Sequence, residues 1–284
     1  MTPNKATPGK VVWLTVLAMT AFAANSIFCR LALAQDSIDP GTFTVVRLAA
    51  GAAVLWLLTR RSSAAQLGGN WSASLALLAY AICFSFAYTN LAAGTGALLL
   101  FAAVQATMVL NGLLKGERFG LVEGCGLALA FCGLIILVAP GVAAPHPIGA
   151  LLMILAGIAW GAYSLLGRGF TNPLKASAGN FLRAIAMALP LLLIPGGHWS
   201  PEGITWAVLS GAFASGLGYV IWYAALAELT ATRAASVQLS VPVIAAIGGV
   251  LFLSEPFTLR LAIASVAVLG GIALIVRYRG TQKA

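Results

Sequence analysis

The amino-acid sequence predicts an all-α integral membrane protein with ten transmembrane helices. Of its 284 residues, 61% are hydrophobic and only 8% are charged, whereas an average soluble chain has roughly 45–50% apolar and 25% charged residues. Ten apolar stretches each approach the ~20 residues that a membrane-spanning helix requires. This composition excludes a soluble enzyme, a disordered chain and a nucleic-acid-binding domain, although the net charge is +9.

The predicted spans follow one another along the chain, and the loops between them are too short for a soluble domain. We therefore treat residues 1–284 as a single transmembrane domain. The spans cover residues 11–34, 41–59, 72–91, 95–114, 121–139, 148–167, 177–194, 204–227, 234–253 and 258–276.

Turn-forming residues separate most of these spans. Asp39-Pro40-Gly41 lies between the first and second spans, and Gly68-Gly69-Asn70 precedes the third. Residues 140–147 and 195–197, both containing proline, follow the fifth and seventh spans. Only two glycines interrupt the apolar run between the third and fourth spans, so this boundary is the least marked.

The distribution of Lys and Arg predicts that both termini are cytoplasmic, because cytoplasmic loops of membrane proteins carry an excess of these residues. With the N-terminus inside, most of the sixteen basic residues fall on the cytoplasmic side. They are Lys5, Lys10, Arg60, Arg61, Lys115, Arg118, Arg168, Lys175, Arg233, Arg277, Arg279 and Lys283. The opposite side receives Arg260, Arg30 near its interface, Asp36, Asp39, Glu202 and Glu255. Leaving out one span would move the basic residues of all later loops to the opposite side, so the segregation also supports ten spans.

The two halves of the chain resemble each other at a nearly constant offset. The aligned groups are Phe22–Ser26 with Trp160–Ser164, Arg30 with Arg168, Glu117 with Glu255 and, within two residues, Arg47 with Arg183. Each half contains five spans, and because five is odd the halves enter the membrane in opposite directions. Such inverted repeats are typical of secondary transporters, whose substrate site lies between the repeats. We place repeat one at about residues 11–139 and repeat two at about 148–276.

The two halves resemble the paired EamA domains of the drug/metabolite transporter superfamily over nearly the whole chain. The resemblance is carried by the small and aromatic residues in the first span of each half, and by Glu117 and Glu255 at the turn between the fourth and fifth spans. Within the superfamily, the sequence is similar to bacterial amino-acid exporters of the YddG type, which are associated with aromatic amino acids. The resemblance implies efflux of amino acids or related metabolites across the bacterial inner membrane.

Polar and aromatic residues at mid-depth share helix faces, and we expect these faces to converge on a central substrate-binding cavity. Aromatic walls would bury an apolar side chain, while amides and tyrosine hydroxyls would hydrogen-bond amino and carboxylate groups. The candidate residues are Phe22, Asn25, Ser26, Tyr80, Phe84, Tyr88, Phe101, Gln105, Trp160, Tyr163, Ser164, Tyr219, Trp222, Tyr223, Gln238 and Pro242.

Several of these residues have alternative roles. Tyr and Trp concentrate at the headgroup level of membranes, which is an alternative for Tyr88 and Trp222 near helix ends. Asn25 and Gln105 could instead form interhelical hydrogen bonds. Pro242 removes a backbone donor inside the ninth span, which leaves a carbonyl free to bond substrate or water.

Four charged residues lie at informative depths. Arg47 and Arg183 fall one or two turns inside their spans, where a charge is costly unless it snorkels or pairs. They are candidates for snorkelling, for gating or for holding a carboxylate. Glu117 and Glu255 occupy short turns, where a carboxylate can cap the following helix, and we interpret both as structural.

The sequence contains no Asp or Glu at mid-membrane. Proton-coupled antiporters of cationic drugs usually need a buried carboxylate there, so facilitated diffusion, or coupling through another route, is favoured over carboxylate-linked drug/proton exchange. No nucleotide-binding loop of the G-x4-G-K-[ST] type is present, which disfavours ATP-driven pumping. The cysteines and histidines form no plausible metal cluster, so we expect neither a cofactor nor a metal.

With the family resemblance, these features predict a secondary transporter that exports amino acids, including aromatic and other large apolar ones, by alternating access. A broad drug/metabolite efflux transporter is the first alternative. A membrane-embedded enzyme of lipid metabolism is the second, but the sparse carboxylates do not cluster, and we expect no enzyme activity. The expected partners are a small-molecule substrate and the lipid bilayer, with no nucleic acid, and the expected assembly is a monomer or weak oligomer.

Overall fold

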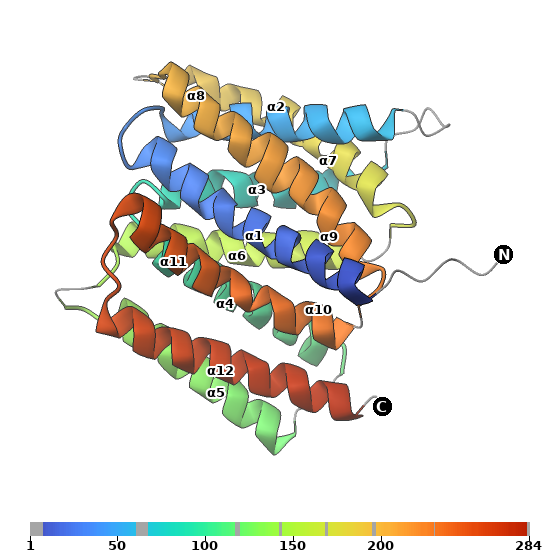
Figure 1. The fold of residues 1–284 in the computed structure, drawn as a ribbon, viewed down its shortest axis with the longest axis vertical. Coiled ribbons are helices and arrows are strands. Elements are labelled where there is room, and N and C mark those ends of the chain that lie inside the picture. Colours follow the sequence, from blue (N-terminus) through green and yellow to red (C-terminus); the bar gives the residue numbers. More distant parts are fainter. Residues whose placement is uncertain are drawn as a thin grey trace.

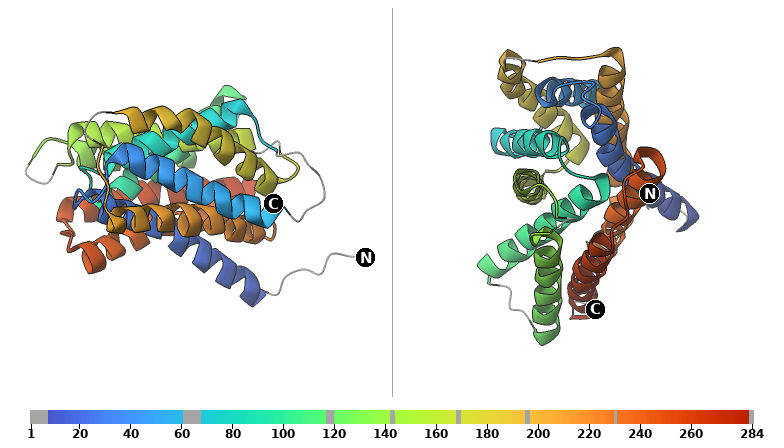
Figure 2. Two further views of the ribbon diagram at one scale, coloured as in Figure 1. Left: turned by 90° about the horizontal axis from the view of Figure 1, so that it is seen from above. Right: turned by 90° about the vertical axis from the view of Figure 1, so that its left-hand side faces the viewer.

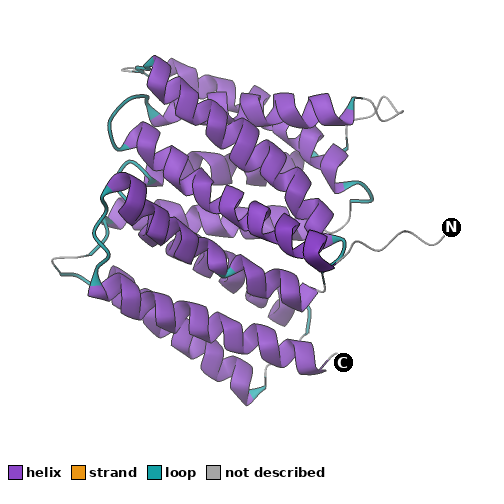
Figure 3. Ribbon diagram, in the orientation of Figure 1, coloured by secondary structure: helices purple, strands orange, loops and turns teal. Residues whose placement is uncertain are grey.

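Helices form nearly all of the computed structural model, which describes residues 8–60, 68–116, 120–141, 144–167, 170–194, 197–229 and 231–282. Over these residues the chain has no strand, only an isolated bridge between Ile38 and Trp199. Figure 3 shows the helices joined by short connections. The predicted all-α class is therefore confirmed. Charged residues of the sequence that lie outside the described residues are Lys5, Arg61, Glu117, Arg118, Arg168 and Lys283.

The first half of the chain forms an uninterrupted helix for each predicted span (Figure 1). These helices are α1 (Pro8–Leu33), α2 (Pro40–Thr59), α3 (Trp71–Ala87), α4 (Ala93–Leu114) and α5 (Leu121–Val138).

The second half is less regular, because two of its spans change helical type or break. It comprises α6 (Pro147–Gly167), α7 (Pro173–Ala188) with the 3₁₀ turn η1 (Leu189–Leu193), α8 (Pro201–Val208) continuing through the π-helix η2 (Leu209–Leu217) into α9 (Gly218–Leu226), α10 (Ala231–Gln238), α11 (Ser240–Leu253) and α12 (Leu259–Gln282).

Within the described ranges, nine helical segments are long and apolar enough to cross a bilayer. The remaining predicted span is α3, which is apolar but has only 17 residues. At 1.5 Å per residue it is about 26 Å long, close to the ~30 Å hydrocarbon core. The helices therefore agree with the ten predicted spans, with the third shorter than expected.

Side-chain caps set the starts of several helices, because each cap satisfies a backbone N–H that has no partner inside the helix. The capping residues are Asp39, Asn70, Asn172 and Ser200. Proline follows at the first helical position in α7 and α8, where its missing N–H is harmless. These helices begin at Pro173 and Pro201, so the predicted starts at residues 177 and 204 are wrong. A prediction from hydropathy alone places these starts too late, because the first turn of each helix contains polar residues.

The end of α3 is set by a buried turn. The helix stops at Ala87, and residues 88–90 form a turn in place of a further helical turn. The Tyr88 carbonyl accepts a hydrogen bond from Arg30 Nη1 at 2.9 Å, and the Tyr88 hydroxyl donates to the Ala93 carbonyl at 3.2 Å. Because Tyr88 is fully buried, it lies in the protein core and not in an interfacial belt.

The ninth predicted span is broken at Leu239, between α10 and α11. Pro242 cannot donate to the carbonyl four residues earlier. Close by, Ser240 Oγ donates to the Val237 carbonyl at 2.6 Å. The ninth predicted span is thus present as Ser236–Leu253, with its helix interrupted one turn before the proline.

The two halves of the chain interleave (Figures 1 and 2). The first helix of one half, α1, packs against η2, α9 and α11 of the other, and α6 packs against α3 and α4. Equivalent helices also pack together, α2 with α7, α4 with α11 and α5 with α12, and the contact of α2 with η2 has its counterpart in that of α7 with α3. Exchanging the halves maps this set of contacts onto itself, as an inverted repeat requires.

The described chain begins and ends at the same end of the bundle, on the right in Figure 1. Exposed Lys10, Arg60 and Lys115 follow or precede helix termini at this end, whereas Asp36 and Asp39 lie between α1 and α2 at the opposite end. The described charges are thus segregated as the sequence predicts. That the end rich in Lys and Arg faces the cytoplasm stays a prediction.

Candidate functional site

A network of aromatic rings joins α1, α3, α6 and α9 near the middle of the bundle. The Trp160 ring on α6 lies 4.9 Å from the Tyr80 ring on α3 and 5.5 Å from the Tyr219 ring on α9, between centroids. Tyr219 also contacts Phe22 on α1 at 6.1 Å. These rings bring the two halves of the chain together at one point. Further ring contacts extend the network to Phe84, Tyr88, Tyr163, Phe181, Trp222 and Tyr223.

Asn25, Tyr80 and Ser210 form a buried polar cluster beside these rings. Asn25 Nδ2 donates to the Tyr80 hydroxyl at 3.2 Å, and Ser210 Oγ donates to Asn25 Oδ1 at 2.6 Å. The amide of Asn25 thereby links α1, α3 and η2. An unsatisfied polar group in hydrocarbon costs several kcal/mol, so these bonds fix the rotamers of all three side chains. Asn25 thus makes an interhelical hydrogen bond and touches the ring network as well.

The π-helix η2 presents Ser210 to this cluster. Ser215 Oγ donates to the Ser210 carbonyl, five residues earlier, at 3.0 Å, and the backbone follows the wider turn of a π-helix. At the next position, Gly211 packs so closely on α2 that a Cβ there would overlap the carbonyl oxygen of Arg47. Glycine at 211 therefore allows η2 to approach α2 and hold Ser210 against Asn25.

Arg47 places a buried cation next to the polar cluster. Its guanidinium carbon lies 5.0 Å from the Phe84 ring centroid, 5.4 Å from that of Tyr80 and 6.0 Å from that of Phe43. The residue is 2% exposed, and its Nη1 has no hydrogen-bond partner in the described part of the chain. Cation–π attraction from the three rings offsets part of the cost of burying this charge.

Arg183, the counterpart of Arg47 in the other half, is held differently. Its Nη1 donates to the Gly68 carbonyl at 3.0 Å, and its guanidinium lies 5.8 Å from the Trp71 ring centroid. Both contacts are at the start of α3, so this side chain reaches toward the end of the bundle as a snorkelling arginine does. The repeat equivalence of the two arginines therefore does not extend to their environments.

A second polar cluster lies on the other side of the aromatic network. The Ser177 hydroxyl on α7 is 3.3 Å from the Tyr163 hydroxyl and 3.4 Å from that of Tyr223. The Tyr163 ring contacts Trp160 at 5.3 Å, and the Tyr223 ring contacts Tyr219 at 6.4 Å. The rings are thus flanked by hydrogen-bonding groups from both halves of the chain.

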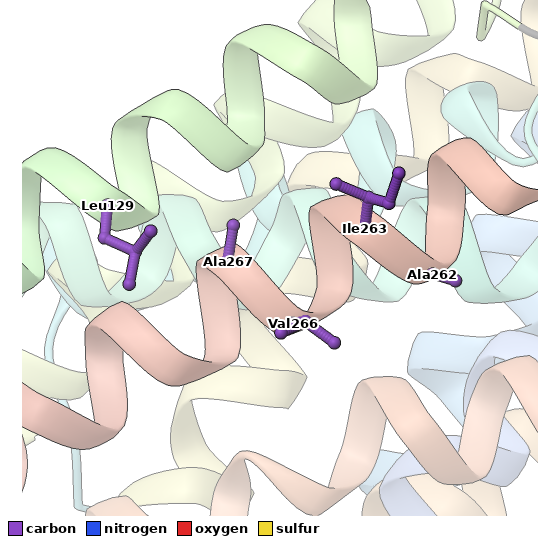
Figure 4. Close-up of a pocket in the computed structure, with 5 residues that line it drawn as sticks. All are labelled: Leu129, Ala262, Ile263, Val266 and Ala267. Carbon is purple, nitrogen blue, oxygen red and sulfur yellow. The ribbon is translucent and has the colours of Figure 1, made fainter.

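A hollow of about 390 Å³ on the outer face of the α5–α12 pair is purely apolar (Figure 4). Its lining residues are Leu129, Ala262, Ile263, Val266 and Ala267. It offers no polar group that could orient a substrate, and Val266 is 76% exposed, as expected for a lipid-facing surface. No group of three or more His, Cys, Asp or Glu residues that could hold a metal ion occurs in the described ranges.

The sequence profile of the EamA-like transporter family matches residues 9–139 and 147–277. The chain belongs to this family. The two matched segments correspond to the two interleaved halves, so the ring network and the Asn25 cluster are built from both EamA domains, whereas the Ser177 cluster lies within the second. Members of the family are transporters, and the chain is therefore a multi-pass membrane protein of a transporter family.

Relatives of this EamA protein cover almost its whole length. An uncharacterized protein of Pseudomonas aeruginosa is 55% identical over 274 residues, which are 95% of this chain and 96% of that protein. A protein of Streptantibioticus cattleyicolor named "Probable terminal-alkyne amino-acid exporter" is 26% identical over 290 residues, 96% of each chain. A solved crystal structure with 21% identity covers 92% of this chain and 98% of its own, with a TM-score of 0.65, which shows a shared fold.

The structure brings most of the predicted EamA site residues into one network. The ring network and its polar clusters contain Phe22, Asn25, Tyr80, Phe84, Tyr88, Trp160, Tyr163, Tyr219, Trp222 and Tyr223. Ser26 is buried beside Asn25, and the Ser164 hydroxyl donates to the Trp160 carbonyl at 2.8 Å. Among the residues that the structure describes, no ring contact or hydrogen bond joins Phe101, Gln105, Gln238 or Pro242 to the network.

Three residues of the site are absent from the sequence-based prediction. Ser210 and Ser177 complete the two polar clusters, and Phe181 contacts Tyr219 at 5.8 Å. Small hydroxyl residues are common on packing faces of membrane helices, so their type alone does not single them out. Their positions on η2 and α7 become informative only once their partners on other helices are known.

Proposed function

We propose that this EamA protein is a secondary exporter of amino acids, including aromatic and other large apolar ones. The observation that supports the proposal is a ring network at the junction of the halves, flanked by two hydrogen-bonding clusters. Small-molecule sites typically combine an apolar lining with a few placed polar groups. The name of the Streptantibioticus relative as an amino-acid exporter points to the same substrate class.

Transport proceeds by alternating access in this proposal. In inverted-repeat transporters the two repeats rock around a site at their interface. The rings of Tyr80 and Trp160 touch each other across that interface here, so a substrate side chain would enter by parting them. Substrate rings would then replace the aromatic contacts that the empty protein makes with itself.

Flux is driven by the substrate's own gradient in this proposal. All seven Asp and Glu residues of the sequence lie near span ends or in loops, and mid-span Asn25 and Ser210 do not titrate. A buried carboxylate that alternates between proton and substrate is therefore lacking.

Purified protein in liposomes tests the proposal directly. Labelled phenylalanine, tryptophan, methionine and threonine should cross the membrane down their gradients, and an imposed pH gradient should leave the rates unchanged. If protein that is correctly folded, as shown by a cooperative unfolding transition, carries none of these amino acids, amino-acid export would be overturned. Flux of unrelated drugs at equal rates would favour broad drug/metabolite efflux instead.

A further inference from the structure

The cation of Arg47 has no counter-ion among the residues that the structure describes. It lies about 10 Å from the start of α2, at 1.5 Å per residue. Neither the ion pair of Arg30 with Glu255 nor that of His198 with Asp36 includes Arg47. A lone charge at this depth is costly unless it pairs. The other buried side-chain atoms without a hydrogen-bond partner in the described chain are Asp39 Oδ2 and Asn180 Nδ2, and neither belongs to a cation.

Arg47 and the neighbouring Tyr80 hydroxyl each have a hydrogen-bond donor that is available to a ligand. Nη1 of the guanidinium lacks a partner in the described chain. The neighbouring Tyr80 hydroxyl accepts from Asn25 Nδ2, which leaves its own hydrogen available to a ligand. Two donors therefore lie beside the ring network, one of them on a fixed positive charge.

We infer that Arg47, assisted by the Tyr80 hydroxyl, binds the carboxylate of the transported substrate. The guanidinium presents parallel N–H groups whose fork matches a carboxylate. A bound carboxylate would neutralise the buried cation and accept a hydrogen bond from its free N–H. Binding would therefore remove the free-energy cost of burying an unpaired charge. The inference deepens the proposed function and rests on it for the identity of the substrate, because it assigns one end of an amino acid to one residue.

Arg183 does not have these properties, although it is the repeat counterpart of Arg47. Its guanidinium already donates to the Gly68 carbonyl and lies over Trp71. The substrate carboxylate is therefore assigned to one half of the chain, and Arg183→Gln supplies a matched control that removes an equivalent charge outside the carboxylate site.

Two probes that share a phenylethyl group and differ in the charged group attached to it test the inference by equilibrium binding to purified protein. The first is 3-phenylpropionate, which has a ring and a carboxylate, and the second is phenethylamine, which has a ring and an ammonium group. Arg47→Gln should weaken 3-phenylpropionate binding by about tenfold to a hundredfold, the range for a lost charge-assisted hydrogen bond. Binding of phenethylamine should change less than twofold, and Arg183→Gln should alter neither affinity.

Equal losses for both probes in Arg47→Gln, or no change for either, would overturn the assignment, as would a wild-type protein that binds no carboxylate. If Arg47→Gln does not fold, Arg47→Lys keeps the charge but loses the fork, and it should weaken 3-phenylpropionate selectively. If Arg47→Lys leaves the ratio of the affinities for 3-phenylpropionate and phenethylamine unchanged, the inference would also be overturned.

Failure of the proposed function has a different signature. In that case wild-type liposomes carry no amino acid, while 3-phenylpropionate still binds in an Arg47-dependent manner. This result would retain the carboxylate site and reject amino-acid export. If wild-type liposomes carry phenylalanine but Arg47→Gln binds both probes as the wild type does, amino-acid export would be retained and the carboxylate site at Arg47 rejected.

Discussion

Arg30 Nε lies 3.0 Å from Glu255 Oε1. Arg30 is near the end of α1 and Glu255 is in the turn between α11 and α12, so this ion pair joins the two halves of the chain. The other carboxylate oxygen, Oε2, accepts the backbone N–H of Ala93 at 2.7 Å, at the first turn of α4. Glu255 is thus structural, as the sequence indicates, but the helix that it caps is not the one that follows it. It caps a helix of the opposite half, and Thr258 Oγ1 caps α12 through the Leu261 N–H.

The Arg30–Glu255 pair is expected to stabilise the fold. Because both side chains are largely buried, removing either partner leaves the other charge unpaired. Arg30→Ala and Glu255→Ala should each lower the free energy of unfolding, and the double variant should lose less than the sum, with a coupling of about 0.5–3 kcal/mol. Unfolding in mixed micelles measures all four proteins, and exposed Glu202→Ala serves as the control. Strict additivity of the two changes would contradict a direct interaction.

The same contact is expected to open during transport. A secondary transporter must separate its halves at each end of the bundle in turn, and this ion pair links them at the end away from the chain termini. Cysteines at positions 30 and 255, joined by a short bifunctional thiol reagent, should abolish amino-acid flux. A reducible reagent should allow flux to return after cleavage. The chain's own cysteines, Cys29, Cys83, Cys125 and Cys132, are first replaced by serine. In this background, Arg30→Cys and Glu255→Cys alone, treated in the same way, should keep their flux. Full flux in the cross-linked protein would show that this end does not open.

Tyr80 is expected to matter both for its hydroxyl and for its ring. Tyr80→Phe removes the acceptor of the Asn25 amide and should lower flux about tenfold, since a buried donor left unsatisfied costs ~1–3 kcal/mol. Tyr80→Ala also removes the contact with Trp160 and should lower flux further. Liposome flux at several substrate concentrations measures both effects, with lipid-facing Trp13→Phe as the control. Normal flux in Tyr80→Ala at normal expression would exclude Tyr80 from the substrate path.

Hydropathy and face periodicity predict the spans and most of the ring network, because aromatic residues at intervals of three or four must share a helix face. They do not predict what distinguishes Arg47 from Arg183. The two residues are equivalent in the repeat, yet only Arg183 finds a backbone carbonyl, which Gly68 of the other half supplies. Likewise, the hydrogen bond between Ser210 and Asn25 depends on a π-helix. The 3.6-residue period of an α-helix does not predict which side chains share a face in a π-helix. Contacts across the repeat, and departures from the α-helix, are what the sequence alone leaves open.

The close approach of η2 and α2 gives a sharp test of the site's architecture. A Cβ at Gly211 would collide with the Arg47 carbonyl, which belongs to the backbone and cannot swing away, whereas a Cβ at Gly124 on α5 would meet nothing within 4 Å. Gly211→Ala should therefore destabilise the protein by about 1–3 kcal/mol through overpacking, and it should lower flux because Ser210 and Arg47 shift together. Gly124→Ala should be neutral or stabilise by up to ~1 kcal/mol, since alanine favours helices over glycine.

Thermal unfolding in detergent and liposome flux, measured on the same two preparations, separate the effects of these glycine substitutions. A Gly211→Ala protein as stable and active as Gly124→Ala would show that η2 does not press on α2 in the working protein. Loss of flux with unchanged unfolding would place the effect on motion between the halves, because the ground-state packing would then tolerate the methyl group while a later state would not. Loss of both, which the geometry favours, would mean that the backbone contact between Gly211 and Arg47 holds the cation and the polar cluster in register.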